Sequence, residues 1–276
     1  MKFVIVNGVV TTKEEANITG FLWNHPLAIS QDIWFGYGGI PLLTENLISL
    51  QEQLHSLGAE LPALFKNRRE LFRLCKRLLN KNRFYRSGYL HFQFFISDGE
   101  VTSLISAENY GGFSFPIAYQ GLLAVISPLK KYSLSEFNQY PCHNRSFWKA
   151  AEVQNGNSAL FTPVLLNEKD MACEGNAANI FIIKKGALIT PSPESGCYDD
   201  VLKKIVMEQA AGLKIPVIES NEIDVKKLQA ADEIFLASEA RGIEWIMGIE
   251  NKRFVRSYSS ALHEKIDEYL KTRVQK

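Results

Sequence analysis

The stretch Glu174-Gly-Asn-Ala-Ala-Asn-Ile-Phe-Ile-Ile-Lys-Lys-Gly-Ala-Leu-Ile-Thr-Pro191 decides the fold. A carboxylate and a turn of small residues lead into two apolar runs, 179–183 and 187–190, which Lys-Lys-Gly separates. Two β-rich runs around such a turn predict a buried hairpin. The acidic pair at 199–200 then offers an N-cap and a negatively charged first turn to a helix that we predict over residues 201–213.

The chain on either side of this stretch predicts a fold of the α/β (α+β) class with two domains. Strand pairs and helices alternate in the first part, where the expected elements are a hairpin at 3–12, helices at 42–57 and 62–82, and a strand pair at 89–96 and 101–107. We place the boundary near Tyr119. The sequence thus predicts a small N-terminal α+β domain, 1–119, and a larger C-terminal α/β domain, 120–276.

Composition excludes several classes of function. The chain is 46% hydrophobic and 22% charged with a net charge of +1, so nothing predicts nucleic-acid binding. Its five histidines show no paired spacing for zinc, and its four separated cysteines are expected to be free thiols in a reducing compartment. No apolar run approaches the roughly 20 residues of a membrane span, and the N-terminal run is too short for a signal peptide. We therefore expect a cytoplasmic protein without metal.

Residues 174–213 resemble the signature of the class IV aminotransferases, with fainter agreement at the N-terminal hairpin and onward to Trp245. This family of pyridoxal-phosphate (PLP) enzymes of fold type IV includes branched-chain aminotransferases, D-amino-acid aminotransferases and aminodeoxychorismate lyases. The resemblance implies PLP as cofactor, a homodimer, and a small-molecule ligand in a cleft between the domains. It also implies that Glu174 bonds the pyridine nitrogen of PLP, which keeps the ring an electron sink. Asn179 matches the asparagine that follows in the family.

The lysine that the family uses for its Schiff base is missing at the matching position. Counting back from Glu174 leads to the neighbourhood of Tyr140, and no lysine occurs from residue 132 to residue 148. Tyr140, Cys142 and His143 lie near the expected position and can do acid–base work, but none of them can form a Schiff base with PLP. The alternative interpretation is that these three residues belong to a structural loop.

The expected phosphate contacts differ as well. Ser49 stands in place of the family arginine, and Glu239 in place of a threonine. The family holds phosphate at a helix N-terminus, where bare amides and the helix dipole favour an anion. Here acidic residues precede that helix and would repel a phosphate. The positions that match the family's cofactor contacts, or could restore positive charge beside them, are Glu174, Asn179, Val201, Leu202 and Arg241.

Three functions remain open at this point. The first is a class IV aminotransferase or aminodeoxychorismate lyase that uses PLP with a shifted lysine, for which Lys149 is displaced and lies within a predicted helix. The second is a degenerate, non-catalytic or PLP-independent member of the family, and the third is another small-molecule enzyme using the same cleft. Because lysine, arginine and threonine are missing together, we favour the second and predict that PLP is not bound covalently.

Overall fold

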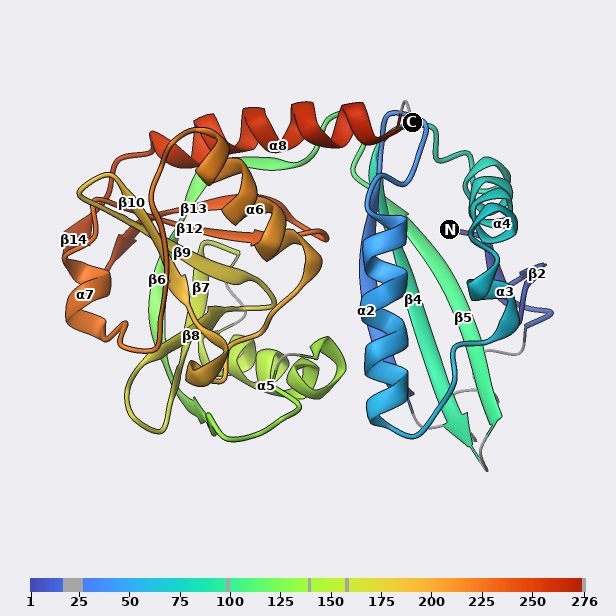
Figure 1. Ribbon diagram of the computed structural model, residues 1–276, viewed down its shortest axis with the longest axis horizontal. Coiled ribbons are helices and arrows are strands. Elements are labelled where there is room, and N and C mark those ends of the chain that lie inside the picture. The colour runs from blue at the N-terminus through green and yellow to red at the C-terminus, as the bar shows by residue number, and fades with distance from the viewer. Residues whose placement is uncertain (17–26, 98–99, 139, 157–158, 275–276) are drawn as a thin grey trace. The chain divides into compact units, whose positions relative to one another are not determined.

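Each half of the sequence builds its own β-sheet. The computed structural model describes the chain except residues 17–26, 98–99, 139, 157–158 and 275–276. The chain divides into two compact units, one comprising Met1–Phe115 with Tyr269–Lys276 and the other Pro116–Glu268 (Figure 1). The predicted boundary near Tyr119 stays a prediction about domains.

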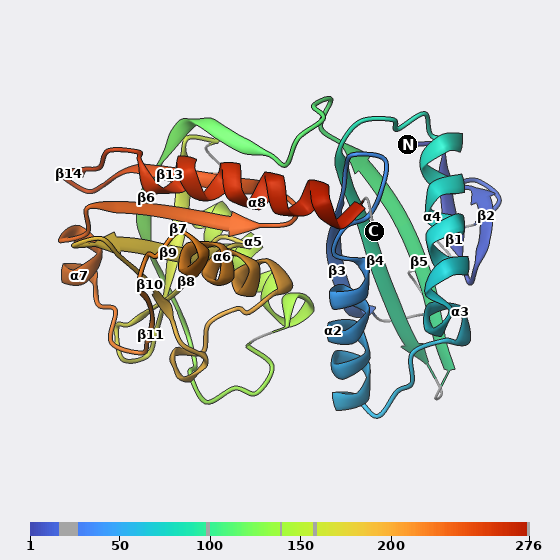
Figure 2. The ribbon, with the colours of Figure 1, turned by 45° about the horizontal axis from the view of Figure 1, so that its top comes forward.

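The first unit is an antiparallel sheet with helices. Its five strands run in the order β2-β1-β5-β4-β3, and α2 packs on β3 while α4 packs on β1 and β2 (Figure 2). The bounds are β1 Phe3–Val6, β2 Val9–Thr12, β3 Leu27–Phe35, α2 Leu43–Ser56, α3 Ala63–Lys66, α4 Arg68–Lys81, β4 Gly88–Ser97 and β5 Glu100–Asn109. The prediction of a single helix over 62–82 is wrong in one respect, because the structure has two helices there, α3 and α4. The helix is interrupted at Asn67, whose side chain accepts a hydrogen bond from the Glu70 amide and so caps α4.

The second unit is built on a mixed sheet of nine strands. The order is β11-β10-β9-β12-β13-β6-β7-β8, with β14 beside β13. The bounds are β6 Ile117–Lys131, β7 Phe161–Asn167, β8 Ala172–Gly175, β9 Asn179–Lys184, β10 Ala187–Pro191, β11 Val217–Ser220, β12 Glu233–Ser238, β13 Gly242–Ile249 and β14 Lys252–Arg253. Parallel pairs (β6 with β7 and β13, β10 with β11) lie beside antiparallel ones, so this is not a doubly wound parallel sheet.

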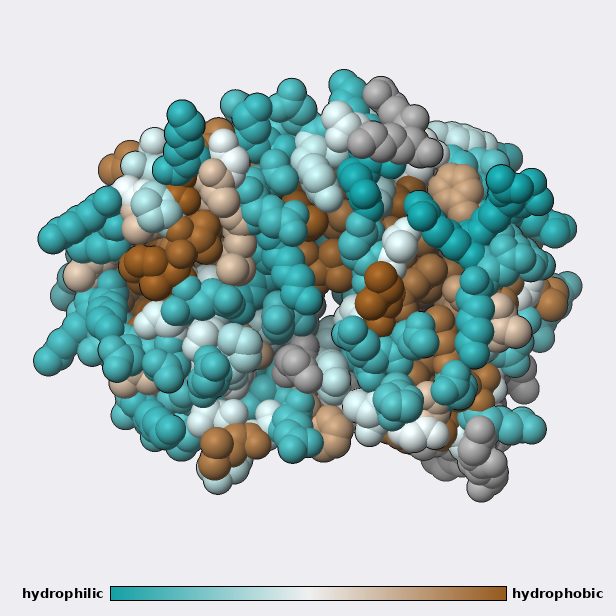
Figure 3. All heavy atoms as spheres, in the orientation of Figure 1, coloured by the Kyte–Doolittle hydropathy of each residue, from teal (hydrophilic) through white to brown (hydrophobic). Residues whose placement is uncertain are grey.

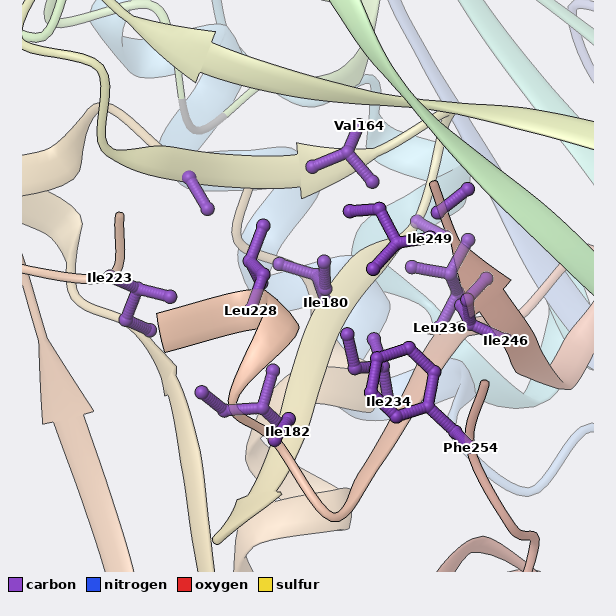
Figure 4. Packing of buried hydrophobic residues seen from close by; sticks show 14 of the residues in the cluster. Val164, Ile180, Ile182, Ile223, Leu228, Ile234, Leu236, Ile246, Ile249 and Phe254 are labelled. Atoms are coloured by element: carbon purple, nitrogen blue, oxygen red, sulfur yellow. The ribbon is translucent and has the colours of Figure 1, made fainter. Parts of the chain in front are cut away.

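Helices and a compact core complete the second unit. They are α5 Pro141–Gln154, the short 3-10 helix Pro193–Ser195, α6 Val201–Gly212, α7 Val225–Gln229 and α8 Tyr258–Val274, whose last residues from Tyr269 belong to the first unit. Aliphatic side chains from β7, β9, β12, β13 and α7 point toward one another in the core (Figure 4). Burial of this kind stabilises by about 25 cal/mol per Å² of apolar surface.

Strand β6 is longer than the sequence predicts, and this matters for the site. The apolar run at 121–126 predicts a strand that ends before Ser127-Pro128, but β6 continues to Lys131. The pairing register with β7 shifts between Ile126 and Lys130. Such an irregularity accommodates proline, which lacks an amide hydrogen for the ladder. As a result Lys131 ends a strand instead of lying in a surface loop.

Most of the atoms on the face shown in Figure 3 belong to hydrophilic residues, with smaller apolar patches between them. Among the described residues, none of the helices is long and apolar enough to cross a membrane.

Candidate functional site

Glu174 lies on β8 with its carboxylate fully enclosed by protein atoms. Its Oε2 accepts hydrogen bonds from Lys131 Nζ at 2.7 Å and from the backbone amide of Tyr198 at 2.6 Å. Its Oε1 accepts a bond from Trp148 Nε1 at 2.6 Å. Both oxygens of the carboxylate are therefore bonded to donors that the chain itself provides.

The three donors come from three different elements. Lys131 ends β6, Trp148 lies on α5, and Tyr198 lies in the segment before α6. The rings of Trp148 and Tyr198 meet edge to face with centroids 5.2 Å apart, in a small apolar cluster with Ala151 and Leu165. The Lys131 and Glu174 side chains are 2% and 0% exposed, so they form an ion pair that is shielded from water. Each charge in such a pair depends on the other, because a lone buried charge is costly.

The first turn of α6 holds a second carboxylate, as the sequence predicts. Asp200 is the N-cap of α6 and accepts a hydrogen bond from the Lys203 amide at 2.9 Å. It also accepts bonds from Asn179 Nδ2 at 2.7 Å and from the Tyr198 hydroxyl at 3.1 Å. Burial, with a smaller contribution from the neighbouring Asp199, outweighs the lowering effect of the hydrogen bonds and raises the pKa of this carboxyl group to about 6. An anionic side chain thus takes the helix amide that would otherwise attract an anion.

Tyr198 links the two carboxylates into one network. Its backbone amide bonds Glu174 and its hydroxyl bonds Asp200, which in turn bonds Asn179. Val201 and Leu202 are buried in the first turn of α6 beside this network. We call the set Lys131, Trp148, Glu174, Tyr198, Asp200 and Asn179 the Glu174 network. Several residues chosen from the sequence therefore meet, although their cofactor roles remain predictions.

The other candidate residues lie apart from this network or are only partly described. Tyr140 is the N-cap residue of α5, and its carbonyl accepts a hydrogen bond from Asn144 Nδ2 at 2.9 Å. Cys142 and His143 belong to the backbone of α5, but their side chains lie outside the described part of the structure. Arg241 donates to the carbonyl of Asn176 and pairs with Glu244, Nε to Oε2 at 3.1 Å.

Lys131 and Lys203 are the buried lysines among the described residues. Lys203 Nζ donates to the carbonyl of Pro191 at 2.8 Å and lies 3.3 Å from a carboxylate oxygen of Glu219. Burial lowers the pKa of this ammonium, but nearby groups, Cys197 and Glu219 among them, raise it above its ordinary value overall. Lys203 is therefore held protonated. The lysine expected to shift along the sequence, Lys149, is exposed and pairs with Glu152 at 3.1 Å.

The residues of the Glu174 network do not fit PLP as they are arranged here. Lys131 already takes the bond that the resemblance assigns to the pyridine nitrogen. Asp200 already takes an amide at the helix start that the resemblance assigns to the phosphate, and its charge opposes an anion there. Among the described residues, no group of three or more His, Cys, Asp or Glu side chains could hold a metal ion.

Sequence reasoning missed Lys131, Trp148 and Tyr198. The pair Lys130-Lys131 after an apparent strand break has the pattern of a solvated turn. Trp148 lies within residues 146–154, whose pattern predicts a helix, and nothing in the sequence indicates that its side chain contacts Glu174. For Tyr198 a weak signal exists, since it stands two residues before the N-cap Asp200 and can reach back to it.

Comparison with known proteins identifies the family to which the sequence is similar. The family model described as amino-transferase class IV matches residues 50–246, more than half of the chain. The "probable branched-chain-amino-acid aminotransferase" of Thermotoga maritima is 40% identical over 80 residues, which is 29% of this chain and 29% of that protein. A second such protein, from Synechocystis, is 30% identical over 101 residues, 37% of this chain and 33% of the relative. The matched region thus spans about a third of the length of these relatives.

Solved structures show that the fold is of fold type IV, like that of branched-chain aminotransferases. The branched-chain aminotransferase of Thermoproteus uzoniensis with norvaline superposes with a TM-score of 0.84 at 21% identity, covering 98% of this chain and 95% of that one. The Legionella pneumophila protein that carries the name 4-amino-4-deoxychorismate lyase gives 0.77 at 17% identity, covering 87% and 90%. At these identities the likeness concerns the fold alone.

Proposed function

Because this chain belongs to the class IV aminotransferase family, we propose that it keeps the family scaffold without holding PLP as a Schiff base, and that it is not a standard transaminase. The observation that carries the proposal is the 2.7 Å bond between Lys131 Nζ and the Glu174 carboxylate. A protein ammonium takes the cationic position, and the missing lysine near Tyr140 leaves no covalent tether. The chain is then a degenerate, non-catalytic or PLP-independent member of its family.

The positions of the reactive atoms in PLP support the interpretation that Lys131 is not a Schiff-base lysine. When PLP is bound in an enzyme, it stabilises the carbanion that forms at the substrate. A lysine that forms the Schiff base must reach the aldehyde carbon, whereas the glutamate must reach the ring nitrogen at the opposite end of the pyridine ring. A lysine in direct contact with that glutamate leaves no room for the ring between them. Lys131 therefore supports the scaffold as the partner of a buried carboxylate.

The network gives the retained residues a structural role. Glu174 joins β8 to β6, α5 and the segment before α6 through its three donors. Asp200 extends the connection to α6 and β9. Hydrogen bonds to charged groups contribute roughly 1.5–3 kcal/mol each, which is enough for such a cluster to be kept after a cofactor is lost.

One observation favours a second candidate, an active PLP-dependent aminotransferase or 4-amino-4-deoxychorismate lyase with a shifted lysine. Lys131 is buried beside the glutamate that the family uses, as a catalytic lysine would be. For this function Lys131 must leave Glu174, lose its proton and bind the aldehyde carbon of PLP. The two candidates therefore differ in what becomes of Lys131 when PLP is added.

A labelling experiment separates them. The protein is incubated with PLP, reduced with borohydride, digested and mapped by mass spectrometry, with an active class IV aminotransferase treated in parallel. We expect no label, or only substoichiometric label spread over exposed lysines such as Lys149. A stoichiometric phosphopyridoxyl group on Lys131 or Lys203, with a matching Schiff-base absorbance band, would overturn the proposal and support the active enzyme.

A homodimer and a cytoplasmic location belong to the same proposal. The segment before α5 carries the exposed apolar side chains Tyr132, Leu134 and Phe137, and such residues are suited to anchor an interface. Sedimentation velocity at micromolar concentration is expected to show a dimer. A monomer throughout would remove the dimer from the proposal and leave the argument about Lys131 unchanged.

A further inference from the structure

A cavity of about 310 Å³ lies in the second unit beside α5. It is lined by residues of α5, β6, β7 and β13, and by Asn176 and Arg241. No member of the Glu174 network lines it. Its volume falls at the lower end of the range for small-molecule sites, roughly 300–1,000 Å³. The cavity is therefore a candidate site distinct from the Glu174 network.

Three polar atoms on residues that line this cavity have no hydrogen-bond partner among the described residues. They are Thr162 Oγ1 and Asn176 Oδ1, on residues that are 3% and 5% exposed, and Glu244 Oε2. The orientation of the Asn176 amide is fixed chemically, because its Nδ2 donates to a carboxylate oxygen of Glu152 at 2.6 Å. All three atoms can accept a hydrogen bond. Because buried polar groups without partners are rare, a ligand that presents several N–H donors would complete this set.

The charges around the cavity favour a neutral ligand. Arg241 pairs with Glu244, Nε to Oε2 at 3.1 Å, and its guanidinium also donates to the carbonyl of Asn176. Lys149, whose side chain is 69% exposed, pairs with Glu152 at 3.1 Å. Two cations thus balance two carboxylates at this cavity. A cationic ligand would be repelled by Arg241, and a carboxylate by Glu244.

The apolar part of the lining suits a flat ring. Leu122, Phe161 and Pro163 contribute to the lining of the same cavity. Nucleobases stack on aromatic side chains and pack against apolar ones, because every base has a π-face. Among the neutral bases, guanine carries the most N–H donors on one edge, where N1–H lies beside the amino group at C2 and the O6 acceptor. A carboxylate can accept from both donors, and arginine is a common partner of O6.

We propose that this cavity binds the guanine ring of a nucleoside or nucleotide. N1–H and the amino group of the ring donate to the Glu244 carboxylate and to Asn176 Oδ1. The O6 atom accepts from Arg241, and the Thr162 hydroxyl, which can both donate and accept, bonds a ring nitrogen. The flat face of the ring packs on Phe161. A base without the amino group would leave one of the buried acceptors unpaired.

The proposal goes beyond the proposed function and does not depend on the fate of PLP at Glu174, because the two sets of residues are separate. The first test is calorimetric titration of the full chain with guanosine, inosine, which lacks the amino group, and N1-methylguanosine, which lacks N1–H. We expect saturable binding of guanosine below millimolar concentration. Each analogue should bind at least about tenfold more weakly, which corresponds to about 1.4 kcal/mol. Inosine bound as tightly as guanosine would overturn the proposal.

Guanosine monophosphate is titrated in parallel, because the guanine ring occurs in nucleosides and in nucleotides. A phosphate beside the exposed Lys149 ammonium would strengthen binding, and Lys149→Gln should then remove the gain. Tighter binding of the monophosphate than of guanosine therefore identifies a nucleotide as the ligand, and equal or weaker binding identifies a nucleoside. Failure of both compounds to bind saturably would overturn the proposal.

Variants then locate the binding. Thr162→Val nearly keeps the side-chain shape and removes the free hydroxyl, so it should fold and bind several-fold more weakly, roughly tenfold at most. Glu244→Gln should weaken binding further and reduce the preference for guanosine over inosine, with folding checked by circular dichroism. Phe161→Leu should weaken binding by removing the stacking ring, and its control is Phe113→Leu, which changes an exposed phenylalanine of the first unit. Binding that is unchanged in all three cavity variants, or equally reduced in the control, would contradict the proposal.

Discussion

The Glu174 network and the cavity beside α5 use the same kinds of side chain to opposite effect. Both combine a glutamate, a cationic side chain and neutral hydrogen-bonding groups in the second unit. At Glu174 every carboxylate oxygen has a donor from the chain, whereas at the cavity Asn176 Oδ1 and Thr162 Oγ1 have none. A buried polar cluster in which every atom has a hydrogen-bond partner contributes to stability. A cavity lined by buried polar atoms without partners is suited to bind a ligand.

The largest expected effect comes from Lys131→Met. It leaves the Glu174 carboxylate charged and buried without its partner, so the free energy of unfolding should fall by about 3–5 kcal/mol. Urea denaturation followed by circular dichroism measures this. Lys130→Met is the matched control, because Lys130 forms an exposed pair with Asp170, and it should cost less than about 1 kcal/mol. The double variant Lys131→Met/Glu174→Gln should recover part of the loss, and no recovery would mean that the pair is not coupled as described.

Trp148→Phe should have the next largest effect. It keeps the ring contact with Tyr198 but removes the hydrogen bond to Glu174 Oε1, which has no other donor among the described residues. Losing a bond to a buried charged group should lower the free energy of unfolding by about 1.5–3 kcal/mol. A change below about 0.5 kcal/mol in the same urea experiment would show that the Oε1 bond is not part of the closed network.

Asp200→Asn should act mainly on the pH dependence of stability. The pKa of this carboxyl group is raised from 3.8 to about 6 in the folded protein, chiefly by burial. A raised acid pKa adds stability that is fully present below about pH 4 and is lost as the pH rises through about 6. The asparagine keeps an acceptor for the Lys203 amide, so the variant should lose stability less steeply than the wild type between those pH values. Urea midpoints across this range test it, and identical slopes would refute it.

The smallest effect is expected on the cavity side. Thr162→Val removes a buried hydroxyl that has no partner among the described residues, so nothing is left unpaired by the change. The free energy of unfolding should stay within about 1 kcal/mol of the wild type or rise slightly. Thermal and urea unfolding in the absence of ligand measure this. A loss of 2 kcal/mol or more, by the scale of ordinary substitutions, would place Thr162 in a closed network like that of Glu174.

The sequence predicted local features well. The two hairpins have clear turns at Asn7-Gly8 and Lys184-Lys185-Gly186, and both form. The N-cap role of Asp200 also follows from its neighbours in the chain. The class IV family and the fold-type-IV fold, which were inferred from residues 174–213, are confirmed by the family match and the solved structures.

Long-range contacts could not be predicted in the same way. The Lys131–Glu174 bond joins residues 43 positions apart and depends on the register shift that carries β6 past Pro128. A helix start is also harder to locate than its interior. The helical pattern of residues 146–154 predicts only the later part of α5, which begins at Pro141. The predicted second helix failed at Asn67 for a similar reason, since its capping bond to Glu70 competes with the helical pattern on either side.

The single bond from Lys131 to Glu174 also constrains how such a protein changes over generations. Introducing a lysine at Tyr140 would supply a nucleophile while Glu174 stayed occupied. Removing Lys131 first would free Glu174 at a large cost in stability. Under the proposed function each step alone brings no benefit, so the descendants of a protein with this bond are expected to diverge further rather than regain PLP binding.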